Sequence, residues 1–390
     1  MYRLLVRALA VGYFAMAISY TTVQLGFTWA GDRATLRASH GDTWNRSLFV
    51  SKLFDTAPKL MDVMPYYYRA SHGHENEDVT VATIVTRPVS AAVHISSTNT
   101  TRRNDLLASL HAIYTSSPLF SRWVDIHVIV DQHDRQFNMW RNVARLYART
   151  DWVMMLDVDF AVCTGVRDRF TSALKKRGEF WELARGGKVA FVVPAFEYVV
   201  QEDGKDWRTF PRTKKALIEL VESRKIAMFH QSWAPGHNST DYEHYYAAQP
   251  GEVYRVTTYQ KSYEPYVIMR RDGPPWCDER FIGYGGNKAA CLFSIYLSGI
   301  NFYVLSDDFL IHQSHAYAEE TRKNERKINK QVYDGFRKEM CIEQISQSLR
   351  INTLHTEDKY NLRQECMKTV GVPEFVLERL DELGQKDQSN

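Results

Sequence analysis

Two aspartates separated by one residue, Asp157 and Asp159, are the residues whose type and spacing most directly suggest chemistry. They follow the apolar run "WVMML", which is typical of a buried strand. Ligands of open α/β sheets bind outside the carboxyl ends of the strands. Alternation along an extended backbone would point both carboxylates to one side, where they repel each other unless a cation lies between them. We therefore predict a metal–diphosphate site, with Mn²⁺ or Mg²⁺ bridging carboxylates and substrate phosphates.

Other interpretations of this D-x-D motif start from its shortness. Out of context, such a pair is more often a solvated turn or a helix cap, and the preceding apolar run is what favours a metal. A phosphatase of the haloacid dehalogenase type would use Asp157 as a nucleophile. That class has Thr or Val two residues after the second aspartate, whereas this chain has Ala161, in the middle of its length. We keep the phosphatase as a less favoured alternative.

The elements that would position these residues alternate along the chain. The pattern predicts strands at 79–86, 125–131, 152–156, 188–196, 263–271 and 301–306. It predicts helices at 104–114, 137–150, 166–183, 284–299 and 319–340, the last one polar and highly charged. Such alternation is typical of an open α/β sheet with parallel crossings. The sequence has no glycine-rich phosphate loop of the GxGxxG or GxxxxGK[ST] kind.

Composition excludes several classes of protein. The chain has 390 residues, 44% of them hydrophobic, and a net charge of +3. We therefore expect a large core. The composition excludes a disordered chain, and the small net charge excludes a nucleic-acid binder built on bulk charge. Five scattered cysteines form no CxxC pair and no disulfide scaffold. In a secreted chain an odd number leaves at least one thiol unpaired, and the sequence does not assign the pairs.

The N-terminus predicts a membrane anchor. Residues 1–7 carry two arginines and read as a cytoplasmic tail, and the uncharged stretch 8–31 reads as a transmembrane signal anchor. A cleaved signal peptide and a transit peptide are the alternatives. Residues 32–77 read as a stem, 78–348 as the catalytic domain and 349–390 as a C-terminal extension. Sequons at Asn45, Asn99 and Asn238 agree with a lumenal chain.

Four ordered blocks resemble glycosyltransferase family 49. They are "FNMWRNVARLYARTDWVMMLDVDF" (137–160), "VVPAFE" (192–197), "YEPYVIMRRDGPPWCDERFIGYGGNK" (263–288) and "FLIHQSH" (309–315). The family includes the C-terminal catalytic domain of the LARGE proteins and a β-1,4-glucuronyltransferase. The similarity runs from about Val79 to Met340. It implies a GT-A fold, a Rossmann-like mixed sheet flanked by helices, with a UDP-sugar donor, Mn²⁺ and inversion at the anomeric carbon.

The resemblance also assigns residues to the metal and the donor. Asp157, Asp159 and His312 match the metal ligands, with His315 as a local competitor of His312. Arg141 and Asn142 match a family pair, and Arg141 would neutralise donor charge or hold Asp157. Asn287 and Lys288 would meet donor oxygens behind a glycine-rich turn. Thr86 and Arg87, at the end of the first strand, would hold the nucleotide.

An inverting transfer also needs a general base for the acceptor hydroxyl. The "CDER" segment offers Asp278 and Glu279, of which we favour Asp278, and Glu197 is a third choice or an acceptor contact. Several aromatic residues would stack on sugars, although such residues are more often core: Trp207, Trp233, Tyr242, Tyr245 and Tyr263.

The expected activity is therefore transfer of one kind of sugar to a glycan on a glycoprotein, in the Golgi membrane. Glucuronic acid is the donor moiety that the resemblance suggests, and N-acetylglucosamine and xylose remain open. A glucuronate carboxylate would need a cation such as Arg270, Arg271 or Lys288. A catalytically inactive relative that binds glycans or scaffolds a partner is the alternative from another class. A homodimer is left open.

Overall fold

The computed structural model describes residues 62–71, 78–82, 88–96, 98–131, 135–315 and 319–387. The expected tail, anchor and most of the stem lie outside these ranges, as do Thr86 and Arg87. Within them, no helix is both long and apolar enough to cross a membrane.

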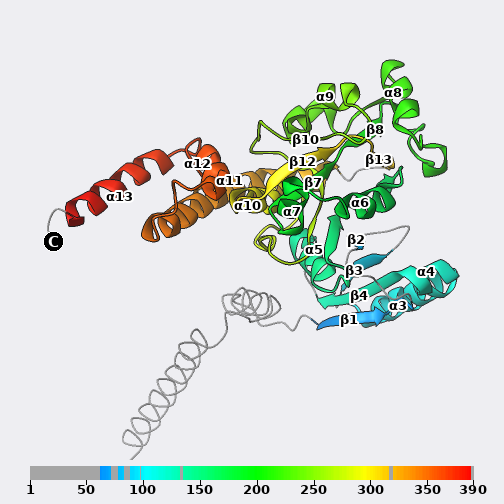
Figure 1. Ribbon diagram of the computed structural model, residues 1–390. Helices are drawn as coiled ribbons and strands as arrows, with labels where there is room; N and C mark the ends of the chain where they lie inside the picture. The colour runs from blue at the N-terminus through cyan, green and yellow to red at the C-terminus, as the bar shows by residue number, and fades with distance from the viewer. Residues whose placement is uncertain are drawn as a thin grey trace, which may run out of the picture. The chain divides into compact units, whose positions relative to one another are not determined.

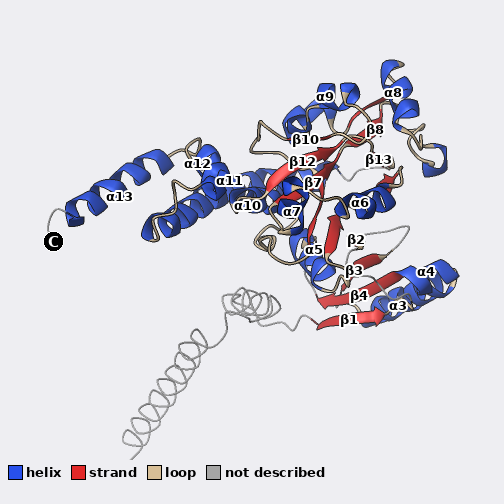
Figure 2. Ribbon diagram, in the orientation of Figure 1, coloured by secondary structure: helices blue, strands red, loops and turns tan. Residues whose placement is uncertain are grey.

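A large mixed sheet forms the centre of the described chain (Figures 1 and 2). In spatial order its strands are β1 (Asp62–Tyr68), β4 (Val124–Asp131), β3 (Val89–Ser96), β2 (Val79–Ala82), β5 (Trp152–Met155), β11 (Tyr266–Arg270), β7 (Val189–Val193), β12 (Asn301–Leu305) and β10 (Val253–Arg255). The strands β4, β3, β2 and β5 run parallel, whereas β11 is antiparallel to both of its neighbours, β5 and β7. The mixed sheet of the expected fold is present, and the expectation of parallel crossings holds for only part of it.

A smaller sheet continues three strands of the large one. Its order is β6 (Phe160–Val162), β13 (Leu310–His312), β8 (Ala195–Tyr198) and β9 (Ile226–Met228). The chain passes from β5 into β6, from β7 into β8 and from β12 into β13 within a few residues each time. The two aspartates lie in the first of these crossings, so the seam between the two sheets is where the site forms.

Helices lie beside the sheets, and the C-terminal helices extend away from them, as Figure 2 shows. Their bounds are α3 (Thr100–Thr115), α4 (Pro118–Trp123), α5 (Phe137–Leu146), α6 (Val166–Leu174), α7 (Glu179–Arg185), α8 (Lys214–Glu222), α9 (Tyr242–Ala247), α10 (Asn287–Leu297), α11 (Glu319–Arg350), α12 (Tyr360–Cys366) and α13 (Val372–Asp387). Short 3₁₀ turns are η1 (Trp207–Thr209), η2 (Gln231–Gly236), η3 (Asn238–Thr240) and η4 (Glu357–Lys359). Every residue of α10 is buried, as its nearly uninterrupted apolar sequence predicts.

Several predicted boundaries were wrong. Strand β3 was not predicted, and the predicted helix 166–183 is two helices with a break at 175–178. The predicted strand 188–196 is two strands, β7 and β8, that belong to different sheets and are separated by Pro194. Proline has no N–H for the ladder, so it suits the point where one sheet gives way to the other. Helix α10 begins at Asn287 because the preceding Gly283, Gly285 and Gly286 have positive φ angles.

Candidate functional site

Asp157 is surrounded by two cations and a tyrosine. Arg141 Nη2 donates to Asp157 Oδ1 (3.0 Å), and Lys288 Nζ lies 3.1 Å from Asp157 Oδ2. The Tyr266 hydroxyl also donates to Oδ2 (2.9 Å), and the Lys288 ammonium lies 3.8 Å from the centre of the Tyr266 ring. These partners come from α5, α10 and β11. Three distant parts of the chain therefore meet at the end of β5.

Electrostatics keep the Asp157 carboxylate ionised. Burial alone would raise its pKa, but Lys288 and Arg141 outweigh burial and hold the pKa well below its usual range. The pKa of the Tyr266 hydroxyl is raised well above its ordinary value by burial and by Asp157 and Asp159, so it stays a hydrogen-bond donor. The result is a fixed anion with cations on either side.

Asp159 faces a different set of partners. The chain turns here, with a hydrogen bond from the Phe160 N–H to Asp157 O (3.2 Å), so the predicted alternation along an extended backbone is wrong. Asp159 Oδ2 lies 3.2 Å from His312 Nε2 and 3.1 Å from His315 Nε2. Burial raises the pKa of Asp159 and the hydrogen bond with His312 lowers it, with a net decrease.

This second group has the composition of a metal site. One ligand atom from each of Asp159, His312 and His315 lies within 4.8 Å of the others. Asp159 Oδ1 is buried and has no hydrogen-bond partner, a cost that a cation would remove. One carboxylate and two imidazoles suit Mn²⁺ as well as other divalent metals. Asp159, His312 and His315 therefore fit a metal together, and Asp157, the other predicted ligand, has Arg141, Lys288 and Tyr266 as its partners.

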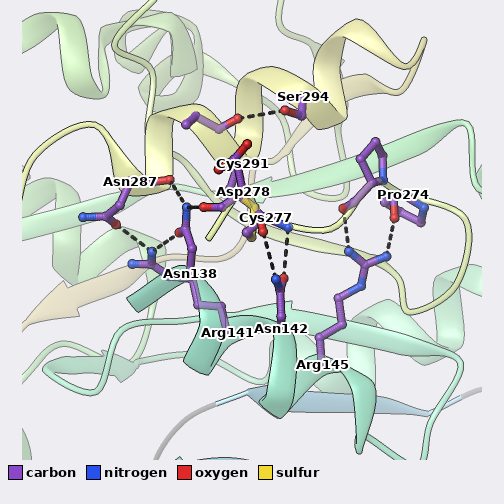
Figure 3. Close-up of a disulfide and its surroundings, with 12 residues drawn as sticks. Asn138, Arg141, Asn142, Arg145, Pro274, Cys277, Asp278, Asn287, Cys291 and Ser294 are labelled. Carbon is purple, nitrogen blue, oxygen red and sulfur yellow. Dashed lines mark hydrogen bonds between the residues drawn. A yellow bond between two sulfur atoms is a disulfide. The ribbon is translucent and has the colours of Figure 1, made fainter. Parts of the chain in front are cut away.

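Side chains of helix α5 hold the loop that precedes α10, as Figure 3 shows. Arg141 Nη1 donates to Asn287 Oδ1 (2.7 Å) and to Asn138 Oδ1 (2.9 Å). Asn138 Nδ2 donates to the carbonyl oxygens of Asp278 (2.7 Å) and Asn287 (2.9 Å). Arg141 therefore fixes Asp157 and the N-terminus of α10 in one contact network.

The rest of that loop is held by two further side chains of α5 and by a disulfide. Asn142 Nδ2 donates to Cys277 O (2.8 Å), and Asn142 Oδ1 accepts from the Cys277 N–H (2.9 Å). Arg145 donates to three backbone carbonyl oxygens of residues 271–275. Cys277 forms a disulfide with Cys291 of α10, and in the C-terminal helices Cys341 pairs with Cys366. Cys163 is buried and unpaired, which confirms that the odd count leaves a free thiol.

Asp278 and Glu279, the two favoured candidates for the general base, lie in this loop and not in the candidate metal site, by which we mean Asp159, His312 and His315. Arg280 Nε lies 2.9 and 3.0 Å from the two oxygens of Asp278, and Arg280 also pairs with Glu339. Glu279 Oε1 accepts from Asn142 Nδ2 (2.9 Å). The Asp278 carboxylate is therefore held in a partly exposed ion-pair network.

Glu197 lies closer to the metal cluster. It is the residue of β8 directly opposite His312 of β13, so the two side chains stand on the same face of the small sheet. Glu197 Oε1 accepts from the His230 N–H (2.8 Å). Burial raises the pKa of Glu197 above its ordinary value, and the backbone N–H of His230 lowers it by less.

Other predicted residues lie elsewhere. Arg270 pairs with Asp151 and Arg271 with Asp272, so both face the other end of β11. The rings of Tyr242, Tyr245 and Tyr263 are buried in the core, whereas Trp207 and Trp233 are exposed.

Sequence reasoning missed Tyr266, Glu264 and His230. The pKa of Glu264 is raised by burial, and the charges of Lys288 and Arg141 lower it by less. Tyr266 and Glu264 stand in the quoted block that begins at Tyr263. Their polar groups, at the start of an otherwise apolar strand, were the signal that could have identified them. Nothing in the uncharged segment around His230 marked it.

A mixed α/β architecture with large mixed sheets and flanking helices fits a GT-A-like fold, the fold of many glycosyltransferases. The chain belongs to the family described as "Glycosyl-transferase for dystroglycan", whose model matches residues 131–344. The resemblance stated from the sequence is thereby confirmed.

Characterised relatives are xylosyl- and glucuronyltransferases. The chain is 34% identical to mouse LARGE2 over 211 residues, which are 53% of this chain and 29% of that protein. It is 32% identical to human LARGE2 over 207 residues (53% and 25%) and to human LARGE1 over 180 residues (46% and 22%). The chain thus spans under a third of the length of the curated relatives it matches.

Proposed function

We propose that this chain is a metal-dependent inverting glycosyltransferase that moves a sugar from a UDP-sugar to a glycan acceptor on a glycoprotein. The observation that carries the proposal is the cluster of Asp159, His312 and His315 with its unpartnered carboxylate oxygen, next to a second carboxylate held by two cations. Family membership supports the same reaction class.

Asp159, His312 and His315 would hold the metal. When bound, Mn²⁺ or Mg²⁺ supplies positive charge that stabilises the departing diphosphate. Asp157 keeps Lys288 and Arg141 at the seam, where an ammonium and a guanidinium suit phosphate oxygens. The Lys288 side chain is only 6% exposed, so its charge acts in a partly dehydrated environment.

The general base would be a carboxylate that takes the acceptor's hydroxyl proton. Glu197 has the better placement, because it stands beside His312 on the small sheet and Asp278 is held by Arg280. Replacing the base should lower kcat by about 10²–10⁴-fold. Glu197→Gln, Asp278→Asn and Glu279→Gln, compared at saturating donor and acceptor, identify which of the three it is.

Glucuronic acid is the proposed donor sugar, with N-acetylglucosamine and xylose as alternatives. The relatives are named for xylosyl and glucuronyl transfer, and Lys288, which pairs with Asp157, is the proposed cation for the glucuronate carboxylate. We also propose a single-pass Golgi location with the catalytic part in the lumen, anchored through residues 8–31.

The test uses the purified protein with a panel of UDP-sugars and Mn²⁺, and it measures release of UDP. Electron paramagnetic resonance of Mn²⁺, recorded without any donor, measures metal binding independently of turnover. We expect Asp159→Asn to weaken Mn²⁺ binding by at least about tenfold and to abolish UDP release. Asp168→Asn, which changes an exposed carboxylate of α6, is the matched control.

Each outcome decides something. UDP release from one donor that is lost on chelation and in Asp159→Asn supports the proposal and identifies the sugar. The absence of both Mn²⁺ binding and UDP release from every donor would refute the proposal. A glycan-binding or scaffold relative would then be the better interpretation.

A further inference from the structure

The segment from His230 to Gly236 spans both halves of the candidate site. At its start, Glu197 of β8 accepts the His230 N–H (2.8 Å), directly beside the metal-cluster strand β13. At its end, the Gly236 carbonyl accepts from the Glu264 N–H (2.8 Å), two residues before Tyr266. One end is therefore held by β8, the neighbour of the strand that carries His312, and the other by the residue two positions before Tyr266.

Aromatic packing fixes the base of this segment. The Phe229 ring lies 5.0 Å from the His312 ring and 3.8 Å, stacked, from the His230 ring. The His237 ring is parallel to the Tyr266 ring, with centroids 6.3 Å apart. A segment held in this way presents its remaining side chains from a rigid support, which lowers the entropy cost of binding.

Trp233 is the large apolar side chain of this segment, and it is exposed to solvent. It is 60% exposed, whereas the ring of Phe160 packs against the rings of Tyr266 and His312. Its backbone N–H donates to His230 O (2.7 Å), so its backbone position is fixed three residues from the Glu197 contact. A ligand that stacks on this indole would remove its apolar surface from water, which favours binding.

The surroundings of Trp233 along the chain are uncharged. Residues 226–240 contain no Asp, Glu, Lys or Arg. Burial lowers the pKa of His237 well below its ordinary value, so its ring is neutral at pH 7. The cations of the site, Lys288 and Arg141, are instead held on Asp157.

We propose that Trp233 is the platform on which a neutral sugar ring of the acceptor stacks. The C–H bonds on one face of a pyranose carry partial positive charge and suit the electron-rich face of an indole. A uronate or phosphorylated sugar would find no cation on residues 226–240, so the proposal specifies a neutral ring. The expected change in acceptor KM rests on the proposed transferase function, whereas the expected binding of a sugar does not.

The experiment compares Trp233→Ala and Trp233→Phe with Tyr360→Ala, which removes an exposed aromatic residue of α12. All are made in an Asn238→Gln background, so that no glycan on the nearby sequon can cover the indole. Thermal unfolding shows that each variant is folded. Saturation-transfer NMR then measures binding of the methyl β-glycosides of xylose, galactose, N-acetylglucosamine and glucuronic acid.

We expect a neutral glycoside to bind, and Trp233→Ala to weaken its binding by about tenfold. Trp233→Phe should retain part of the affinity and Tyr360→Ala all of it. Where transfer is measurable, the acceptor KM of Trp233→Ala should rise by a similar factor. Unchanged binding in Trp233→Ala, or preferential binding of the glucuronide, would overturn the inference. A wild-type chain that binds the glycoside through Trp233 but releases no UDP would refute only the transferase proposal.

Discussion

His127 should make the stability of this protein depend on pH, because its ring can be accommodated only in the neutral form. The side chain is fully buried in β4. Its Nδ1 accepts the Tyr66 N–H (2.9 Å), and its Nε2 lies 3.0 Å from Ser90 Oγ. The Ser90 hydroxyl donates to Ala144 O (2.6 Å), so its oxygen is left to accept the proton of Nε2. A second proton, on Nδ1, would face the Tyr66 N–H.

The magnitude follows from the pKa. Burial is the largest influence and lowers the pKa of His127 from 6.5 to about 4. The unfolded chain therefore binds more protons between these two values, so stability is present above about pH 6.5 and is lost as the pH falls. Linkage with these two pKa values gives a loss of about 2 kcal/mol between pH 7.5 and pH 5, and about 3 kcal/mol in full below pH 4.

Urea unfolding of wild type and His127→Gln at a series of pH values isolates this contribution, because all other titrating groups are shared. His111→Gln, which changes an exposed histidine of α3, is the control. We expect the free-energy difference between wild type and His127→Gln to shrink by about 2 kcal/mol from pH 7.5 to pH 5. A difference that stays constant over this range would refute the assigned tautomer and the burial argument together.

Two further substitutions test the contacts around the site. Lys288→Met and Asp157→Asn should each destabilise the protein by about 2 kcal/mol. This value is smaller than that of a fully buried ion pair because the Asp157 side chain is 33% exposed. In a double-mutant cycle, the double variant should lose less stability than the sum of the two single variants. Gly299→Ala should cost about 3 kcal/mol in thermal or urea unfolding, because the residue has φ +89° and its Cβ would lie 2.4 Å from Asp358 O. Gly273→Ala, also at positive φ but in open space, should cost only about 1 kcal/mol, and equal losses would contradict the collision.

Local patterns predicted the elements that carry the site, but only some of their ends. The run "WVMML" predicted β5, and the amphipathic stretch from Phe137 predicted α5. Pro194 was the signal that separates β7 from β8, and it was not used. Periodicity indicates which face of a segment is buried, and it carries no information on which sheet a strand joins.

Partners within the site were harder to predict, since they are distant in sequence. Tyr266 and Lys288 meet Asp157 across 109 and 131 residues. Motif spacing identified Asp157 and Asp159, and the family resemblance added Arg141, Lys288 and His312. The resemblance did not show that Arg141 also reaches Asn287, because that contact depends on how α5 packs against α10.

Asp157 and Asp159 are adjacent in the D-x-D motif, but in the fold they have different partners. Arg141, Lys288 and Tyr266 donate to the two oxygens of Asp157, which leaves these oxygens less capacity for a metal. Asp159 instead retains one buried oxygen without a partner. We propose that Asp157 acts through the cations that it holds in place, and Asp159 through direct ligation of the metal. On this argument Asp157→Asn should weaken nucleotide binding even where Mn²⁺ binding persists, whereas Asp159→Asn should lose the metal first.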